Sequence, residues 1–189
     1  MSKESKRTQV QAEIAEAFYG IVYPEDGRIL SSGEDYFDLE DFLDTTLSHC
    51  SWRDIPLGIM EKKKNSSILC FGTPQFYRWI IPAYMTYTLE FLLNTETPDV
   101  SLVLMEQTVS EISCDVISYL EDEYSQTPSE ENKNHLIESR NHTIRHRSLL
   151  SQEQKLTFKS FLEFIVVYSD DESSRDYAYM AIKKQYYLL

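Results

Sequence analysis

The sequence predicts an all-α fold, an irregular bundle of about six helices around a central helix that a proline kinks. Apolar residues recur at spacings of three and four in several segments, which is the helical period. Stretches of alternating polarity, typical of strands, are absent. A chain of 189 residues has the usual length of one domain. We therefore expect a single domain over 1–189, with an exposed loop or insertion at 125–147.

The first predicted helix covers residues 6–19 and ends at Gly20, before a turn that contains Pro24. Its apolar stripe consists of Val10, Ile14, Ala17 and Phe18. A second helix is expected over 35–49 and a short third one over 52–62.

The second predicted helix carries an acidic outer face. Asp38, Asp41 and Asp44 lie on it, mostly in the first turns, where the helix dipole favours negative charge. Its apolar residues, Leu39, Phe42, Leu43 and Leu47, would face the core. This acidic face is a candidate binding surface.

The central helix begins at Thr73-Pro74, because threonine is a good N-cap and proline fits the first helical position. Its stripe contains Phe76, Ile80, Ala83, Tyr84, Tyr87 and Phe91. Pro82 interrupts it, since its ring clashes with the carbonyl group of Arg78. We expect a kink there, or two helices that meet end to end.

The last part of the chain begins with a long predicted helix over 99–124. Its apolar stripe is Leu102, Met105, Val109, Ile112, Val116 and Tyr119. Cys114 would be a small buried residue within this helix, and the acids 121–123 would form its solvated end. The polar segment 125–147 has no core pattern, so we expect an exposed loop with one or two helical turns.

Two further helix starts have clear signals. Ser151 and Gln154 have the spacing of a capping box, which predicts a helix through Tyr168. Asp170 and Asp171 would begin a final helix.

Composition narrows the classes of function. The formal net charge is −13, which favours a partner with a basic surface and disfavours nucleic acid and anionic membranes. The three cysteines form no C-x-x-C pair, and neither a signal peptide nor an apolar run of about 20 residues is visible. We therefore expect a cytoplasmic protein without a cofactor.

The segment 135–147 gathers three histidines and three arginines, namely His135, His142, His146, Arg140, Arg145 and Arg147. On a helix, the imidazoles and Glu138 would share a face and could bind a divalent metal. A solvated polar segment is the preferred interpretation, so no metal is expected. The arginines could bind an acidic partner, but pairing with the acidic surface of the chain itself is favoured.

The stretch from Thr73 to Tyr84 is the densest unusual motif, and it resembles a family of uncharacterised bacterial proteins of unknown function. Ile81-Pro82-Ala83-Tyr84 matches a Leu-Pro-Ala-Tyr signature of that family. Further matches are Ala17, Phe18, Pro24, Trp52, Leu150, Ser151, Gln154, Phe161 and Leu162. The resemblance implies no activity. We interpret the aromatic residues of the motif first as packing residues.

Two functions remain in competition, since the acidic balance disfavours a third, a nucleic-acid regulator whose only support is the basic patch from Arg140 to Arg147. The first is a non-enzymatic, bacterial, protein-binding module, for example an immunity protein that blocks a toxin, with Asp38, Asp41, Asp44 and exposed tyrosines as its surface. The alternative is an enzyme or small-molecule-binding protein with a site beside Pro82, to which Arg78 and Tyr84 would contribute. No known catalytic motif occurs in the chain, which favours the first.

Overall fold

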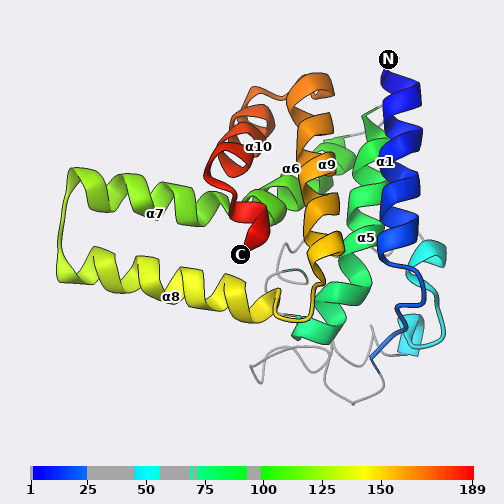
Figure 1. Ribbon diagram of the computed structural model, residues 1–189, viewed down its shortest axis with the longest axis horizontal. Helices are drawn as coiled ribbons and strands as arrows, with labels where there is room; N and C mark the ends of the chain where they lie inside the picture. Colours follow the sequence, from blue (N-terminus) through cyan, green and yellow to red (C-terminus); the bar gives the residue numbers. More distant parts are fainter. Residues whose placement is uncertain (1, 25–44, 56–68, 70–71, 93–98) are drawn as a thin grey trace. The chain divides into compact units, whose positions relative to one another are not determined.

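A computed structural model describes residues 2–24, 45–55, 69, 72–92 and 99–189, with side chains from Val103 onwards in the last range (Figure 1). The predicted all-α class is confirmed, since the regular elements in these ranges are helices. They are α1 (Lys3–Ala17), η2 (Trp52–Asp54), α5 (Pro74–Phe91), α6 (Asp99–Ser113), α7 (Asp115–Gln126), α8 (Glu130–His146), α9 (Gln152–Tyr168), α10 (Glu172–Lys184) and η3 (Tyr186–Leu188), where η marks a 3₁₀ helix.

Contacts divide the chain into two compact units, Met1–Thr108 and Val109–Leu189, which are described separately. The single-domain organisation stays a prediction. Within the described ranges, no helix combines the length and the hydropathy needed to cross a membrane. The predicted acidic face with Asp38, Asp41 and Asp44 lies outside the described residues, as does most of the helix expected at 52–62.

In the first unit, α1 packs against α5 through the predicted stripe. Val10, Ile14 and Phe18 are fully buried. The chain leaves α1 through Gly20, whose φ of 71° is accessible to glycine without strain. The indole Nε1 of Trp52 donates to the carbonyl oxygen of Phe18 at 3.2 Å, which fixes this exit.

Helix α5 buries eleven of its 18 residues. Thr73 caps it by accepting a hydrogen bond from the Phe76 amide at 3.3 Å, as predicted. The helix continues through Pro82 to Phe91, so the alternative of two helices that meet end to end is wrong, and the kink stays a prediction. Proline inside a helix costs about 3 kcal/mol, whereas each fully buried large apolar side chain contributes about 1.5–3 kcal/mol. The eleven buried residues are Phe76, Tyr77, Trp79, Ile80, Ile81, Pro82, Ala83, Tyr84, Met85, Thr88 and Leu89.

The long helix expected over 99–124 is two helices, α6 and α7. They are separated by Cys114, which adopts a left-handed conformation with φ 56°. This break changes which face of the following helix is buried. Ile117 is 1% exposed, whereas Val116 and Tyr119 of the predicted buried stripe are 57% and 66% exposed.

The predicted loop over 125–147 is also wrong, because most of it is helix α8. This helix pairs with α7 as a hairpin (Figure 1). The Ser129 hydroxyl accepts from the Asn132 amide at 3.0 Å, and acidic residues in the first turn and basic residues in the last complement the helix dipole. His146 is the only residue of α8 that is buried, so the expected exposure holds for most of the segment but not for His146 and Arg147 at its end.

Helices α9 and α10 form the core of the second unit, onto which η3 packs. The predicted capping box is present, with Ser151 and Gln154 bonded reciprocally. Asp171 caps α10 by accepting from the Ser174 amide at 2.6 Å. The buried apolar residues of the two helices are Phe158, Phe161, Leu162, Phe164, Ile165, Ala178 and Ala181.

Candidate functional site

An open groove of about 400 Å³ lies between α7 and α10 in the second unit, within the usual size range of binding pockets. It is lined by Asp115, Val116, Ser118, Tyr119, Asp122 and Tyr177. Large apolar side chains gather at this depression although water reaches them. Tyr119 is 66% exposed, Val116 57% and Tyr177 43%.

The groove follows from the local geometry of α7. Asp115, Tyr119 and Asp122 are separated by four and three residues, so they lie on one face of the helix. Ile117 points to the core and fixes the orientation of that face. On the opposite side, α10 buries Ala178 and presents Tyr177 to the groove.

The groove is acidic. Two of its six lining residues, Asp115 and Asp122, are carboxylates, and none is lysine or arginine. One oxygen of Asp115 accepts from the Val116 amide at 2.6 Å at the start of α7. A cation that entered the groove would meet two carboxylates and the rings of two tyrosines.

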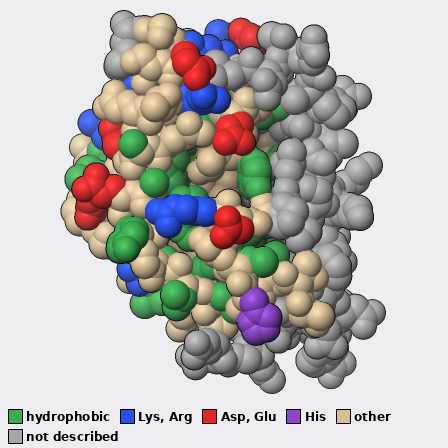
Figure 2. Space-filling view, turned by 90° about the vertical axis from the view of Figure 1, so that its right-hand side faces the viewer, with side chains coloured by type: hydrophobic (Ala, Val, Ile, Leu, Met, Phe, Trp, Pro, Cys, Tyr) green, Lys and Arg blue, Asp and Glu red, His purple; other side chains and the backbone are tan. Residues whose placement is uncertain are grey.

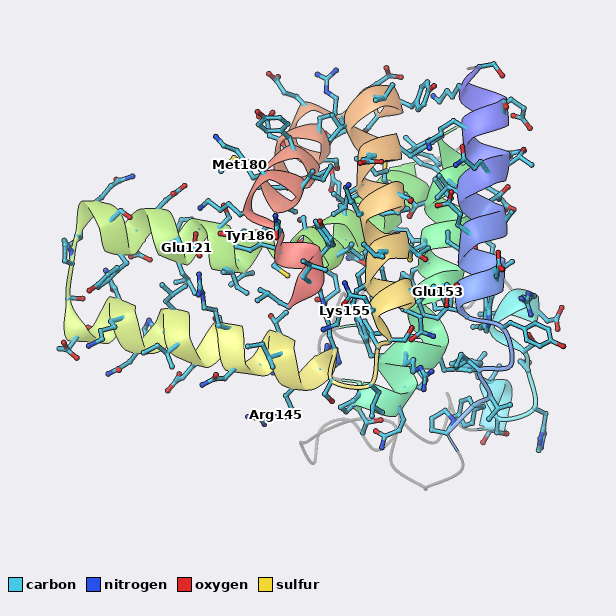
Figure 3. All side chains as sticks on the ribbon, viewed as in Figure 1. Glu121, Arg145, Glu153, Lys155, Met180 and Tyr186 are labelled. Atoms are coloured by element: carbon cyan, nitrogen blue, oxygen red, sulfur yellow. The ribbon has the colours of Figure 1, made fainter. Side chains whose placement is uncertain are left out.

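Glu121 fastens α7 to its neighbours on the face next to the groove. Its carboxylate accepts hydrogen bonds from Arg140 of α8, from Lys184 Nζ at 2.6 Å and from the Tyr186 hydroxyl at 2.5 Å. Figure 3 shows Glu121 and Tyr186 side by side. The expectation that residues 121–123 form a solvated end is therefore wrong for Glu121, whose side chain is 19% exposed.

These contacts shift the pKa values of all three ionisable groups. Burial alone would raise the pKa of Glu121, but hydrogen bonds from Lys184, Tyr186 and Arg140 outweigh it, and the pKa is lowered. Burial, together with the bond to Glu121, raises the pKa of Tyr186 to about 12. The hydrogen bond to Glu121 raises the pKa of Lys184. At neutral pH the carboxylate and the ammonium group are both charged, and they hold α7 to α10.

Arg147 is a buried cap rather than part of a basic surface patch. Its guanidinium group donates to the carbonyl oxygen of Glu111, to that of Ile112 at 3.3 Å and to that of Tyr186 at 3.4 Å. The first two belong to the C-terminal turn of α6, where helices have unpaired carbonyls. Because Arg147 is fully buried, the predicted patch of three arginines does not exist.

The other two arginines of the segment 135–147 have different environments from that of Arg147. Arg140 pairs with Glu121, so the favoured interpretation, pairing with the acidic surface of the chain itself, is confirmed for this arginine. Arg145 points away from α7 (Figure 3).

Cys114 is buried beside Arg147, with its Sγ atom 4.0 Å from the Tyr186 carbonyl oxygen, and burial raises the pKa of its thiol. A buried, protonated thiol is a poor nucleophile.

The histidines of α8 do not converge on a common point. The rings of His142 and His146 are 5.4 Å apart between centroids, and the buried His146 has its Nδ1 atom 3.7 Å from Glu111 Oε1. His135 is exposed. Among the residues that the structure describes, no group of three metal-ligand side chains could hold an ion.

The two candidate residues beside Pro82 lie in the first unit. Tyr84 is 3% exposed and packs within the helix core, while Arg78 is half-buried on the same helix. The motif residues Tyr77 and Trp79 are fully buried, as the packing interpretation requires. The ring of Trp79 meets that of Tyr23 edge to face at 4.9 Å between centroids. The acidic candidates Asp38, Asp41 and Asp44 cannot be placed beside them, because they lie outside the described ranges.

On the face of the molecule shown in Figure 2, acidic and basic side chains of described residues are interspersed. Comparison with models of known protein families, with curated proteins and with solved structures gave no match. The resemblance carried by Thr73 to Tyr84 therefore stays a prediction.

Proposed function

We propose that the protein is a non-enzymatic binding module that holds a basic partner protein in the groove between α7 and α10. The observation that carries the proposal is the groove itself, in which exposed tyrosines and carboxylates meet without a basic residue. Exposed clusters of large apolar side chains are typical of interaction sites, and tyrosine is enriched at such interfaces. The lining includes no histidine, cysteine or lysine that could serve Ser118 as a base.

The charge of the whole chain supports the same function. A net charge of −13 attracts a basic protein over a distance and raises the rate of its capture. The acidic segment with Asp38, Asp41 and Asp44 belongs to this proposal as a source of that attraction. An immunity-type inhibitor in the cytoplasm of a bacterium, which neutralises a basic toxin, is the specific role that we propose.

The alternative site beside Pro82 has weaker support. Tyr84 and Tyr77 are buried, so their side chains stabilise α5 and do not line an open surface. A binding site needs side chains that a ligand can reach. We therefore place the partner on α7 and α10.

The proposal can be tested by quantitative affinity capture from cell lysate with three forms of the purified protein. The groove variant is Tyr119→Ala with Asp122→Asn. The matched control, Ile137→Ala with Glu138→Gln, likewise removes one exposed apolar side chain and one exposed charge, but from α8. We expect a basic protein to be retained by the wild type and the control and to be lost by the groove variant.

The retained protein is then purified and titrated directly against the three forms. A loss of affinity confined to the groove variant supports the proposal. Failure of any protein to bind in stoichiometric amount, or an equal loss for the groove and control variants, would contradict it.

A further inference from the structure

We infer that the groove between α7 and α10 recognises arginine side chains, so that its occupant is an arginine-bearing, extended segment of the partner. This inference rests on the proposed function and adds the chemistry of the bound residues. It follows from three features of the groove, namely the spacing of its carboxylates, the exposure of its tyrosines and the rigidity of its walls.

The two carboxylates have a defined separation. Asp115 and Asp122 lie seven residues apart on one face of α7, which is about 10 Å along the helix axis. Tyr119 lies between them on the same face. A chain in the extended polyproline II conformation rises about 3.1 Å per residue and completes one turn in three residues, so side chains three positions apart in the partner lie on the same face and span about 9 Å. Two cations at that spacing could each reach one carboxylate.

The tyrosines favour arginine over lysine. Tyr119 from α7 and Tyr177 from α10 line the groove and are 66% and 43% exposed. A planar guanidinium group stacks on an aromatic ring and can still bind a carboxylate through two parallel hydrogen bonds. An ammonium group is more strongly hydrated and has no plane to stack. The chain already uses this contact elsewhere, since the guanidinium carbon of Arg53 lies 4.6 Å from the ring centroid of Trp52.

The groove is also held in place before a ligand arrives. Glu121 bonds to Lys184 of α10 and to Tyr186, which ties the two walls together. The same carboxylate is already neutralised by Arg140 and Lys184, so it does not compete for the incoming arginine. A preformed site loses less conformational entropy on binding. The attraction for the ligand therefore comes from Asp115 and Asp122.

The test uses three fluorescently labelled eight-residue peptides and measures their dissociation constants by fluorescence anisotropy. The peptides consist of glycine and serine with two arginines, two lysines or two citrullines three positions apart. Citrulline keeps the shape of arginine without its charge. The salt concentration is about 0.15 M, at which long-range attraction is screened within about 8 Å.

We expect the arginine peptide to bind about two- to fivefold more tightly than the lysine peptide, in line with the strength of exposed cation–π contacts. The citrulline peptide should bind at least about tenfold more weakly. Tyr119→Ala with Asp122→Asn should abolish the difference between arginine and lysine. Ile137→Ala with Glu138→Gln should leave all three dissociation constants within about twofold of wild type.

Equal affinity for the arginine and lysine peptides, or an equal loss in both variants, would overturn the inference. Tighter binding of free spermidine than of the arginine peptide would also overturn it, since the ligand would then be a small polyamine. If no peptide binds but the captured partner still depends on Tyr119 and Asp122, the arginine inference fails and the proposed function stands. If the captured partner is indifferent to these residues, the proposed function itself fails.

Discussion

The tyrosines of α5 and those of the groove have opposite environments. Tyr77 and Tyr84 of α5 are 0% and 3% exposed, whereas Tyr119 of α7 and Tyr177 of α10 are 66% and 43% exposed. The residue type is the same, but on α5 the side chains fill the core of the first unit, and on α7 and α10 they remain in water. Tyrosine can do either, because its ring is apolar and its hydroxyl group is polar. A dense aromatic motif therefore does not by itself indicate a binding site.

The largest expected effect is a difference in the free energy of unfolding between two variants in which a tyrosine is replaced by alanine. Tyr77→Ala should lower the free energy of unfolding by about 3–5 kcal/mol, because it removes a fully buried aromatic side chain and leaves a cavity. Tyr119→Ala should change it by less than about 0.5 kcal/mol. Urea denaturation followed by circular dichroism measures both. Similar losses for the two variants would show that Tyr119 belongs to the core.

A second expected effect concerns Arg147, the buried cap of α6. Arg147→Met should lower the free energy of unfolding by about 2–4 kcal/mol, because it leaves buried carbonyl groups without their donor. Arg145→Met, two residues earlier at an exposed position, serves as the control and should cost less than about 0.5 kcal/mol. Equal stability of the two variants would show that the guanidinium group of Arg147 does not stabilise this junction.

A smaller effect, dependent on pH, is expected at Glu121. Glu121→Gln should lower the free energy of unfolding at pH 7 by about 1 kcal/mol, because the charge-assisted bonds to Lys184 and Arg140 are lost. The folded-state pKa of Glu121 lies below its ordinary value of 4.5, so this contribution is complete above that pH. It should shrink as the pH falls below 4.5 through the folded-state pKa. A difference between variant and wild type that stays constant from pH 7 to pH 3 would contradict the ion-pair interpretation.

The smallest effect is expected at the start of α8. Ser129→Ala removes the hydroxyl group that accepts from the Asn132 amide and should cost about 0.5–1 kcal/mol. Because the other residues of α8 bury little apolar surface, the loss of the cap should increase amide hydrogen exchange in the first turns of this helix. Ser151→Ala, at the buried helix α9, provides the comparison and should leave exchange in the middle of its helix unchanged. Unaltered exchange at Asn132 in the Ser129 variant would show that the cap is unimportant.

The sequence was most informative where helices have local signals. The caps at Thr73, Ser151 and Asp171 and the stripe of α1 could be recognised because each involves residues within four positions of one another. The burial of the motif around Tyr84 could be predicted as well, since large aromatic residues at helical spacing usually pack.

The break at Cys114 and the groove could not be recognised in the same way. The local feature at the end of α6 is the left-handed backbone conformation of Cys114, which its sequence does not indicate. The side chain that caps this end is that of Arg147, more than 30 residues later in the chain. Without the break, the continuous periodicity placed Val116 and Tyr119 in the core. The only local signal for the groove was the spacing of Asp115, Tyr119 and Asp122 along one helix face, which a solvated face would show equally well.

Helix α8 illustrates a related difficulty. Its sequence contains no apolar stripe, so hydrophobic periodicity indicated a loop. Its stability comes instead from the Ser129 cap, the complementary charges at its two ends and the anchors Arg140 and His146. The partners of these anchors are on α7 and at the end of α6, and contacts between such distant positions cannot be read from local pattern.

The most direct test of the difference between the two sets of tyrosines is an NMR titration of the ¹⁵N-labelled protein with the arginine peptide. We expect the largest chemical-shift changes at Val116, Tyr119, Asp122 and Tyr177, with the amides of Tyr77 and Tyr84 unaffected. That result would identify α7 and α10 as the binding surface and α5 as core. Changes concentrated on α5, or spread evenly over acidic residues outside the groove, would contradict this assignment.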